Sequence, residues 1–486
     1  MVVQHNMQAA NASRMLNITS NAQAKSTEKL SSGYKINRAA DDAAGLSISE
    51  KMRKQIRGLD QASTNAQDGV SAVQTAEGAL TEVHSMLQRM NELAVQASNG
   101  TNSESDRSSI QDEINQLTTE IDRVAETTKF NETYLLKGDY GTKTIQIKAH
   151  DAGLDGTLTQ NTTKATFTVK ALAQGDTYTI GGTKYTIGVQ GQDTATQISN
   201  AKTILGANSL NNGEVIKIDG KSFTIADDTN VNTSELNKDE IDKFASQGST
   251  IEYNGKSVTL FNDQAENGPS SGVDSKDTTL ITAAKAYELI ANELRTASSI
   301  GADAVIDPAT VKFGSTDVTT PAPATTNVMP EDAEDVEVTF TMTKGTAEVQ
   351  KDLSFNLHVG SDADITKMIG VTIEDMSSAS LGIQGLNVAD ATGKAATYAI
   401  DAIADAVERV SSQRSSLGAI QNRLEHTIAN VDNVVENTNA AESRIRDTDM
   451  ADEMVTYSKN NILAQAGQAM LAQANQATQG VLSILG

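Results

Sequence analysis

The sequence contains no cysteine and no tryptophan, and aromatic residues make up only 3% of its 486 positions. Without cysteine, the chain can form neither disulfides nor thiolate metal sites. Because aromatics are so few, its cores must be built from Ala, Leu, Ile, Val and Met, which suits helix packing better than a large enzyme core. The net charge is −24, so the surplus of lysine and arginine that phosphate binding needs is absent, and we expect no nucleic-acid partner.

Proline is missing from residues 1–268 and 331–486, because all five prolines lie between positions 269 and 330. The N-terminus lacks a basic stretch followed by an apolar run, so we expect no signal peptide of the usual kind. No window reaches the roughly 18 apolar residues of a membrane-spanning helix. These absences favour a cytoplasmic protein, unless the chain is exported by another route.

Recognisable catalytic motifs are also missing. The five histidines are scattered and form no HExxH pair. Gly-Lys-Ser at 220–222 and 255–257 lacks the upstream glycine of a phosphate-binding loop. Asp41 and Asp42 precede a predicted helix, so we expect them to cap its N-terminus rather than bind a metal. We therefore predict no enzyme and no catalytic, cofactor-binding or metal-binding residue; an enzyme or ligand-binding module within residues 141–352 is the alternative.

Apolar residues recur every seven positions in both halves of the chain. From Met52 to Ala97 two such tracks run three residues apart over six heptads, which is typical of a coiled-coil seam. A second helix is predicted over 110–124, and a similar repeat starts at Ile403. We expect a mostly α rod in which these long helices, from both chain ends, pack as a coiled-coil bundle. Its predicted seam contains Leu59, Val73, Leu80, Leu87, Ile403, Val410, Leu417 and Leu424.

The centre of the chain has a different pattern. Residues 141–390 carry −16 of the net charge. Three stretches each place two short β runs around Gly-Gly, Asp-Gly or Asn-Gly, dipeptides that form tight hairpin turns; they are residues 177–187, 215–225 and 251–261. Helical patterns follow the hairpins. We predict an inserted α+β domain of loosely repeated hairpin-plus-helix units.

Both ends of the chain are almost uncharged. No charged residue occurs from Asn460 to Gly486, and Arg14 is the only one in the first 24 positions. The last helix has one apolar stripe surrounded by alanine, glycine and eight amides. Amides would need partners inside a membrane, and a peripheral anchor would need lysine or arginine on its polar face.

Two explanations of the uncharged ends remain. The last helix could be buried inside its own molecule, or both ends could be buried by other copies of the chain. We favour the second, because amides can hydrogen-bond across an interface without desolvating a charge. A head-to-tail contact that does not close grows into an open helical fibre. The residues expected at this interface are Met7, Leu16, Leu463, Met470, Leu471, Val481 and Leu485.

The stretch LSSGYKINRAADDAAGLSISEKMRKQIRGLDQASTNAQDGVSAVQTAEGAL, residues 30–80, closely resembles the N-terminal signature of bacterial flagellin. The amide-rich last helix resembles the C-terminus of that family. Other stretches that look like shared blocks of the family are residues 87–101, 109–131, 417–431 and 442–455. The resemblance covers about 1–138 and 353–486, more than half of the chain.

The resemblance implies a structural subunit of the bacterial flagellar filament, which self-assembles through its termini into a helical tube used for motility. It implies that residues 1–45 and 450–486 form the filament core. Residues 46–140 and 353–449 would form the coiled-coil rod with a small β element, and 141–352 a variable, surface-exposed insertion. The protein would be secreted into the extracellular filament through the flagellar channel, without a cleaved signal peptide.

The resemblance also implies partners. These are other copies of the chain, an export chaperone at roughly 445–486, and the filament cap and hook-junction proteins, with no membrane insertion. A Toll-like innate immune receptor would read Arg89 and Leu93, with Glu113 on the facing helix. Met90 and Asn91 differ from the residues of some family members.

Overall fold

The computed structural model describes residues 6–485 except 208–209, 227–233, 238–239, 264–268, 303–309, 314–315, 319–336 and 391–392; for 310–318 and 477–485 it describes at most the backbone. The described chain divides into two compact units. Unit 1 comprises Met1–Val73, Phe355–Val371 and Gly418–Gly486. Unit 2 comprises Gln74–Ser354 and Thr372–Leu417.

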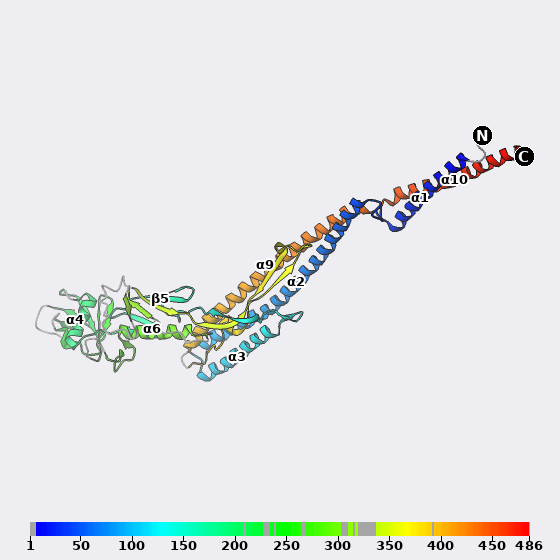
Figure 1. Ribbon diagram of the computed structural model, residues 1–486. Coiled ribbons are helices and arrows are strands. Elements are labelled where there is room, and N and C mark those ends of the chain that lie inside the picture. Colours follow the sequence, from blue (N-terminus) through cyan, green and yellow to red (C-terminus); the bar gives the residue numbers. More distant parts are fainter. Residues whose placement is uncertain are drawn as a thin grey trace. The chain divides into compact units, whose positions relative to one another are not determined.

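Long helices form both ends of the chain (Figure 1). They are α1 (Met7–Ser32), α2 (Ala43–Ser98), α3 (Glu104–Thr127), α9 (Lys394–Arg446) and α10 (Met450–Leu485). Of the two residues expected to cap α2, Asp42 does so, because its Oδ1 accepts a hydrogen bond from the Gly45 N–H at 2.9 Å. Asp41 instead accepts from the backbone N–H groups of Asn37 and Arg38 at 3.3 and 3.0 Å. At the other end of α2, the buried Arg107 donates to the carbonyl oxygens of Ala97 and Asn99 at 2.9 and 3.3 Å. A cation is favourable there because helix C-termini carry partial negative charge.

Helices α2 and α9 run antiparallel and side by side (Figure 1). In unit 1, the Ser63 hydroxyl donates to Asp432 at 3.0 Å, and in unit 2, Arg414 lies 3.7 Å from Glu77. The apolar residues of the predicted seam are all buried. Burial of each such side chain stabilises the pair by about 1.5–3 kcal/mol, so the heptad pattern accounts for this packing.

Small residues of α2 allow a β-hairpin to lie against the helix. The hairpin consists of β18 (Leu353–His358), the 3-10 turn η2 (Ile365–Lys367) and β19 (Met368–Ile373). In unit 1, a Cβ atom at Gly69 would lie 2.2 Å from Leu357 Cδ1, and one at Gly58 would lie 3.0 Å from Ser361 Cα. The Asn65 amide donates to the His358 carbonyl oxygen at 3.0 Å. The two glycines therefore leave room for the hairpin.

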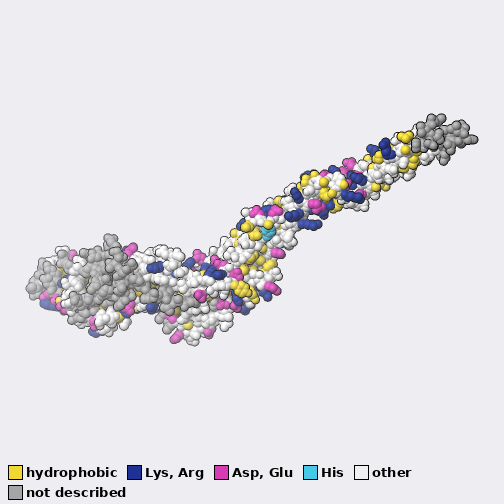
Figure 2. All heavy atoms as spheres, in the orientation of Figure 1, with side chains coloured by type: hydrophobic (Ala, Val, Ile, Leu, Met, Phe, Trp, Pro, Cys, Tyr) yellow, Lys and Arg dark blue, Asp and Glu magenta, His cyan; other side chains and the backbone are white. Residues whose placement is uncertain are grey.

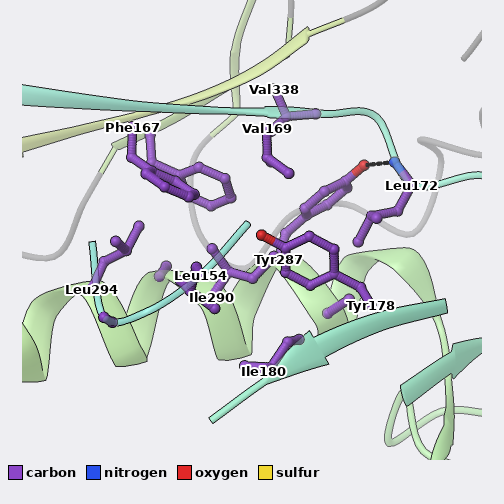
Figure 3. Close-up of a cluster of buried hydrophobic side chains, with 14 of the residues drawn as sticks. Leu154, Phe167, Val169, Leu172, Tyr178, Ile180, Tyr287, Ile290, Leu294 and Val338 are labelled. Atoms are coloured by element: carbon purple, nitrogen blue, oxygen red, sulfur yellow. Dashed lines mark hydrogen bonds between the residues drawn. The ribbon is translucent and has the colours of Figure 1, made fainter. Parts of the chain in front are cut away.

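One sheet of the insertion packs against a helix. Its strand order is β15-β14-β16-β5-β4, and the helix is α6 (Ala283–Ser298). The strands are β4 (Thr157–Gln160), β5 (Lys164–Lys170), β14 (Thr310–Phe313), β15 (Thr316–Val318) and β16 (Glu337–Thr343). Figure 3 shows Tyr287, Ile290 and Leu294 of α6 pointing toward Phe167 and Val169. The Tyr287 hydroxyl accepts a hydrogen bond from the Leu172 N–H at 2.8 Å, which satisfies a polar group inside the core.

A second core lies within the insertion. Its sheet has the order β10-β9-β8-β11-β12 and is packed by α4 (Thr194–Leu205) and α5 (Ile241–Phe244). The strands are β8 (Val215–Ile218), β9 (Lys221–Ile225), β10 (Glu235–Leu236), β11 (Thr250–Tyr253) and β12 (Lys256–Thr259). A three-stranded sheet is formed by β6 (Thr177–Ile180), β7 (Thr183–Ile187) and β13 (Leu280–Ile281). Two further pairs of strands are β1 (Lys129–Phe130) with β2 (Thr133–Tyr134), and β3 (Asp139–Gln146) with β17 (Thr346–Lys351). The short helix α8 covers Ser378–Leu381.

The three predicted hairpins are present, as β6–β7, β8–β9 and β11–β12. Their turns have the expected positive φ angles, for example 49° at Asp219 and 78° at Gly220. A helix follows each hairpin, namely α4, α5 and α6 in turn. The predicted fold class, helical chain ends packed together with an inserted α+β region, is confirmed. Within the described part of the chain, no helix combines the length and apolarity needed to cross a bilayer.

Candidate functional site

The two terminal helices form an antiparallel pair in unit 1 (Figure 1). At one end the Asn6 side-chain amide donates to the Ala474 carbonyl oxygen at 3.1 Å, and its Oδ1 caps α1 by accepting from the Ala9 N–H at 3.0 Å. At the other end Lys29 lies 3.5 Å from Glu453. Between them, Gly467 leaves room for Leu16, because a Cβ there would lie 3.3 Å from Leu16 Cδ1. These contacts fix the register of the pair.

The pair leaves most of its apolar side chains uncovered. Met7 is 69% exposed and Met470 60% exposed, while Leu16 and Leu471 are half-buried. Among the described side chains of α1, only Ser26 is buried. Figure 2 shows hydrophobic side chains on the surface of these helices. Apolar patches of this kind are rare on monomeric proteins and mark interaction sites.

The exposed side chains line two hollows. A groove of about 780 Å³ lies between α1 and α10, and Met15, Leu16, Leu463 and Met470 contribute to its walls. A second hollow of about 520 Å³ lies on α10, lined by Met454, Val455, Ser458, Lys459, Ile462 and Leu463. The predicted interface residues Val481 and Leu485 lie outside the part of α10 whose side chains are described.

Several members of this surface were not predicted from the sequence. Met15 and Ile18 are exposed on α1, as are Met454, Val455 and Ile462 on α10. Their signal was present in the sequence, because each is a large apolar residue within one of the two terminal helices. Among the described side chains, neither α1 nor α10 buries an apolar residue, so these residues remain available to a neighbouring chain.

In unit 1, the break between α1 and α2 lies beside the break between α9 and α10. Gly33 ends α1 with a φ of 77°, and Tyr34, the next residue, forms a β-bridge with Asp447 in the other break. The Lys35 N–H donates to the Arg446 carbonyl oxygen at 2.7 Å, and the Thr448 N–H donates to the Gly33 carbonyl oxygen at 3.0 Å. The Arg446 guanidinium lies 4.7 Å from the centre of the Tyr34 ring and 3.1 Å from Glu50. These contacts hold the α1–α2 and α9–α10 connections together.

A charged cluster occupies the predicted receptor surface in unit 2. Arg89 on α2 donates to Glu113 on α3 at 2.9 Å and to Glu92 at 3.1 Å, and all three side chains are exposed. The hydrogen bond to Glu113 raises the pKa of Arg89. The expectation that Leu93 belongs to this surface is wrong, because its side chain is only 2% exposed. Its burial places Leu93 on the packed side of α2 rather than on the outer side.

Among the described residues, no three His, Asp or Glu side chains are arranged to hold a metal ion. The surfaces described above consist of apolar groups, amides and mutually paired charges, which suits binding to other protein chains. The class that these features define is a structural protein with paired helical ends and an inserted α+β region.

Comparison with known proteins identifies the family. The family model for the bacterial flagellin N-terminal helical region matches residues 3–140, and that for the C-terminal helical region matches 400–485. Flagellin of Clostridium tyrobutyricum is 39% identical over 99% of this chain and 100% of its own length. Polar flagellin A of Vibrio parahaemolyticus is 34% identical over 100% of this chain and 99% of its own.

A solved structure of FliC from Burkholderia pseudomallei is 19% identical and aligns with 73% of this chain and 99% of that one, at a TM-score of 0.26. The chain belongs to the bacterial flagellins and is a structural subunit of the flagellar filament, as its sequence motifs predicted.

Proposed function

We propose that this chain assembles into the filament through α1 and α10, and that the side chains of Met7, Leu16, Leu463, Met470 and Leu471 are buried there by other copies. The observation that carries this proposal is the uncovered apolar surface of α1 and α10, whose outer parts, residues 7–24 and 460–485, contain only Arg14 as a charged residue. Burying such a surface releases about 25 cal/mol per Å² of apolar area. Because few charges must be desolvated, most of that gain is kept. Val481 and Leu485 are proposed to extend the same interface.

We assign the remaining parts of the chain accordingly. Residues 1–45 and 450–486 form the filament core, and 46–140 with 353–449 form a coiled-coil layer around the seam that starts at Leu59. Residues 141–352 are the surface-exposed insertion. The insertion is not an enzyme in this proposal, and its role is display on the filament surface.

We infer further partners from the family resemblance. A chaperone covers roughly 445–486 before export through the flagellar channel, since the apolar surface of α10 would otherwise be exposed. The filament cap and hook-junction proteins contact the ends of the assembly. A Toll-like receptor reads the exposed Arg89 and Glu113, with Glu92 beside them, while the buried Leu93 acts only by holding α2 in place.

A charge placed on the terminal surface tests the assembly proposal. Met470→Asp should leave the circular dichroism and the unfolding midpoint of the monomer nearly unchanged, because Met470 is mostly exposed. It should raise the critical concentration for polymerisation by about 30-fold or more, since the filament would bury an unpaired carboxylate.

The matched control is Val215→Asp, which charges an exposed apolar residue of the insertion. This variant should polymerise like the unmodified chain. Normal polymerisation of Met470→Asp would refute the proposed interface, and a large drop in monomer stability would show that α10 is packed within its own molecule.

A further inference from the structure

Much of the exposed apolar surface of α1 and α10 is methionine. The two helices contain five methionines, and all of them are 49% to 69% exposed; they are Met7, Met15, Met450, Met454 and Met470. In the rest of the described chain, Met368 is the one exposed methionine, at 39%, whereas Met90, Met342 and Met376 are buried. The exposed thioether sulfur of the chain is thus concentrated on the two terminal helices.

Three of these methionines line the two hollows of unit 1. Met15 of α1 and Met470 of α10 both contribute to the walls of the groove of about 780 Å³ between the helices. Met454 lines the hollow of about 520 Å³ on α10. Both hollows are much larger than a molecule of hydrogen peroxide. A small oxidant therefore reaches these sulfur atoms in the free chain without any movement of the helices.

Methionine carries the only sulfur in the chain, because cysteine is absent. A hydroperoxide oxidises a thioether by a two-electron step. A sulfur lone pair attacks one peroxide oxygen, an S–O bond forms as the O–O bond breaks, and the departing hydroxide takes up the proton and leaves as water. The sulfur is oxidised and the peroxide is reduced. The product, methionine sulfoxide, is polar where methionine is apolar, and specific reductases convert it back.

Oxidation of these residues acts differently on the free chain and on the assembled one. In the free chain the sulfoxide oxygen lies in water, since the methionine side chains are already exposed, so the fold loses little. In an interface that buries Met7 and Met470, the same oxygen loses its hydrogen bonds to water. Interfaces rich in methionine are disrupted by this change. Oxidation is therefore expected to oppose assembly without unfolding the subunit.

We propose that the five methionines of α1 and α10 are sites of reversible oxidation that controls assembly. A hydroperoxide converts them to sulfoxides in the free chain and blocks polymerisation. Burial in the filament protects them, and reduction of the sulfoxides restores a chain that polymerises. The inference rests on the proposed function, because it takes α1 and α10 as the subunit interface.

Mapping of the sulfoxides tests where and when oxidation occurs. The free chain and preformed filaments are treated with the same concentration of hydrogen peroxide, digested, and analysed by mass spectrometry for sulfoxide at each methionine. The terminal methionines should react about tenfold faster in the free chain, because oxidation follows exposure. The buried Met90, Met342 and Met376 should react slowly in both samples, which confirms that the chain stayed folded. Equal rates for the terminal methionines in the two samples would overturn the proposal.

Polymerisation of the oxidised chain tests the effect on assembly. After removal of peroxide, the oxidised chain should keep its circular dichroism and unfolding midpoint, and its critical concentration should rise about tenfold or more. Methionine sulfoxide reductases that act on the two epimers should restore the original value. An unchanged critical concentration of the oxidised chain, or no recovery after complete reduction, would refute the proposal.

Leucine variants identify the sulfur atoms responsible. Leucine is close to methionine in volume but cannot form a sulfoxide. A chain in which all five terminal methionines are replaced by leucine should polymerise after peroxide treatment at the critical concentration that it has before treatment. Met368→Leu, the matched control outside the terminal helices, should remain as sensitive to peroxide as wild type. Equal sensitivity of the five-leucine chain would contradict the proposal, because other methionines would then be responsible.

Met470→Asp separates a failure of this inference from a failure of the proposed function. If Met470→Asp blocks polymerisation while the oxidised wild-type chain polymerises normally, the terminal interface stands and control by oxidation is refuted. If Met470→Asp polymerises normally, the interface itself is refuted, and the proposed control by oxidation falls with it.

Discussion

Asp401 shows how much the surroundings of one side chain decide its chemistry. It lies near the start of α9, half-buried, close to the carboxylates of Asp151 and Asp405. Lys148, a cation beside these carboxylates, is paired with Asp405 at 3.1 Å and Glu408 at 2.6 Å. Burial and the two neighbouring carboxylates raise the pKa of Asp401 to about 6. Asp401 is therefore a source of pH dependence in unit 2.

The sign of this pH dependence follows from linkage. The folded state binds a proton at Asp401 in the range from about pH 4 to 6, where the unfolded chain has released it, so this group makes stability fall as pH rises through that range. Asp401→Asn should stabilise the chain at pH 7 by about 1 kcal/mol, after allowance for solvent screening of a half-exposed group.

The advantage of Asp401→Asn should vanish as pH falls toward 4. Urea unfolding at several pH values measures it, with Glu436→Gln, an exposed change on the same helix, as the control. In wild type and in the Asp401→Asn variant alike, His150 has the opposite effect on stability. Burial lowers the pKa of His150, so its contribution reduces stability as pH falls below about 6.5. An unchanged difference between the variant and wild type from pH 4 to pH 7 would contradict the assignment.

At the scale of elements, α2 depends on where its glycines lie. Gly69 faces Leu357 in a cluster that includes Ala66, Ile369 and Leu424, whereas Gly78 has no neighbouring atom within 4 Å of an added Cβ. Gly69→Ala should therefore destabilise the chain by about 1–2 kcal/mol through overpacking. Gly78→Ala should stabilise it by about 0.5–1 kcal/mol, because glycine costs that much inside a helix.

Thermal unfolding of the two variants checks this pair of opposite effects. Because both substitutions lie on one helix and add one methyl group, propensity alone predicts the same gain for each. Equal stabilisation by both would mean that the hairpin does not rest on Gly69 in solution.

The elements that sequence predicted are those governed by local rules. Heptad spacing placed Leu80 and Leu87 in the buried seam, and Asp219-Gly220 marked a hairpin turn, because both depend only on nearby residues. Long-range features were not predicted. Tyr140 and Gly141 of β3 oppose no residue of β17, and this bulge depends on pairing with a strand some 200 positions away. The close approach at Gly69 depends on a hairpin nearly 300 positions away. Leu93 was misassigned because resemblance alone did not reveal which side of α2 is covered.

At the scale of the whole molecule, the segment that forms the second core of the insertion begins and ends at neighbouring points. The Val189 N–H donates to the Thr259 carbonyl oxygen at 2.8 Å, and Val189 forms a parallel β-bridge with Leu260. The residues between them have their own buried core. Replacing 190–259 by a short glycine linker should therefore leave the other core and the helical ends folded, because chain entry and exit stay adjacent.

The shortened chain should keep its helical circular dichroism and form filaments at a critical concentration within a few-fold of the full chain. Electron microscopy and sedimentation measure both properties. Loss of all filaments by a folded, shortened chain would show that this part of the insertion takes part in assembly.

The central claim is that the terminal helices α1 and α10, with their almost uncharged ends, are subunit interfaces. The most direct test is electron microscopy after short filament seeds are added to the purified full chain and to a chain that lacks residues 450–486. The account predicts long fibres of uniform width from the full chain and only monomers, with the remaining structure folded, from the truncated one. Fibres from the truncated chain, or a full chain that stays monomeric with α10 protected from protease, would contradict it.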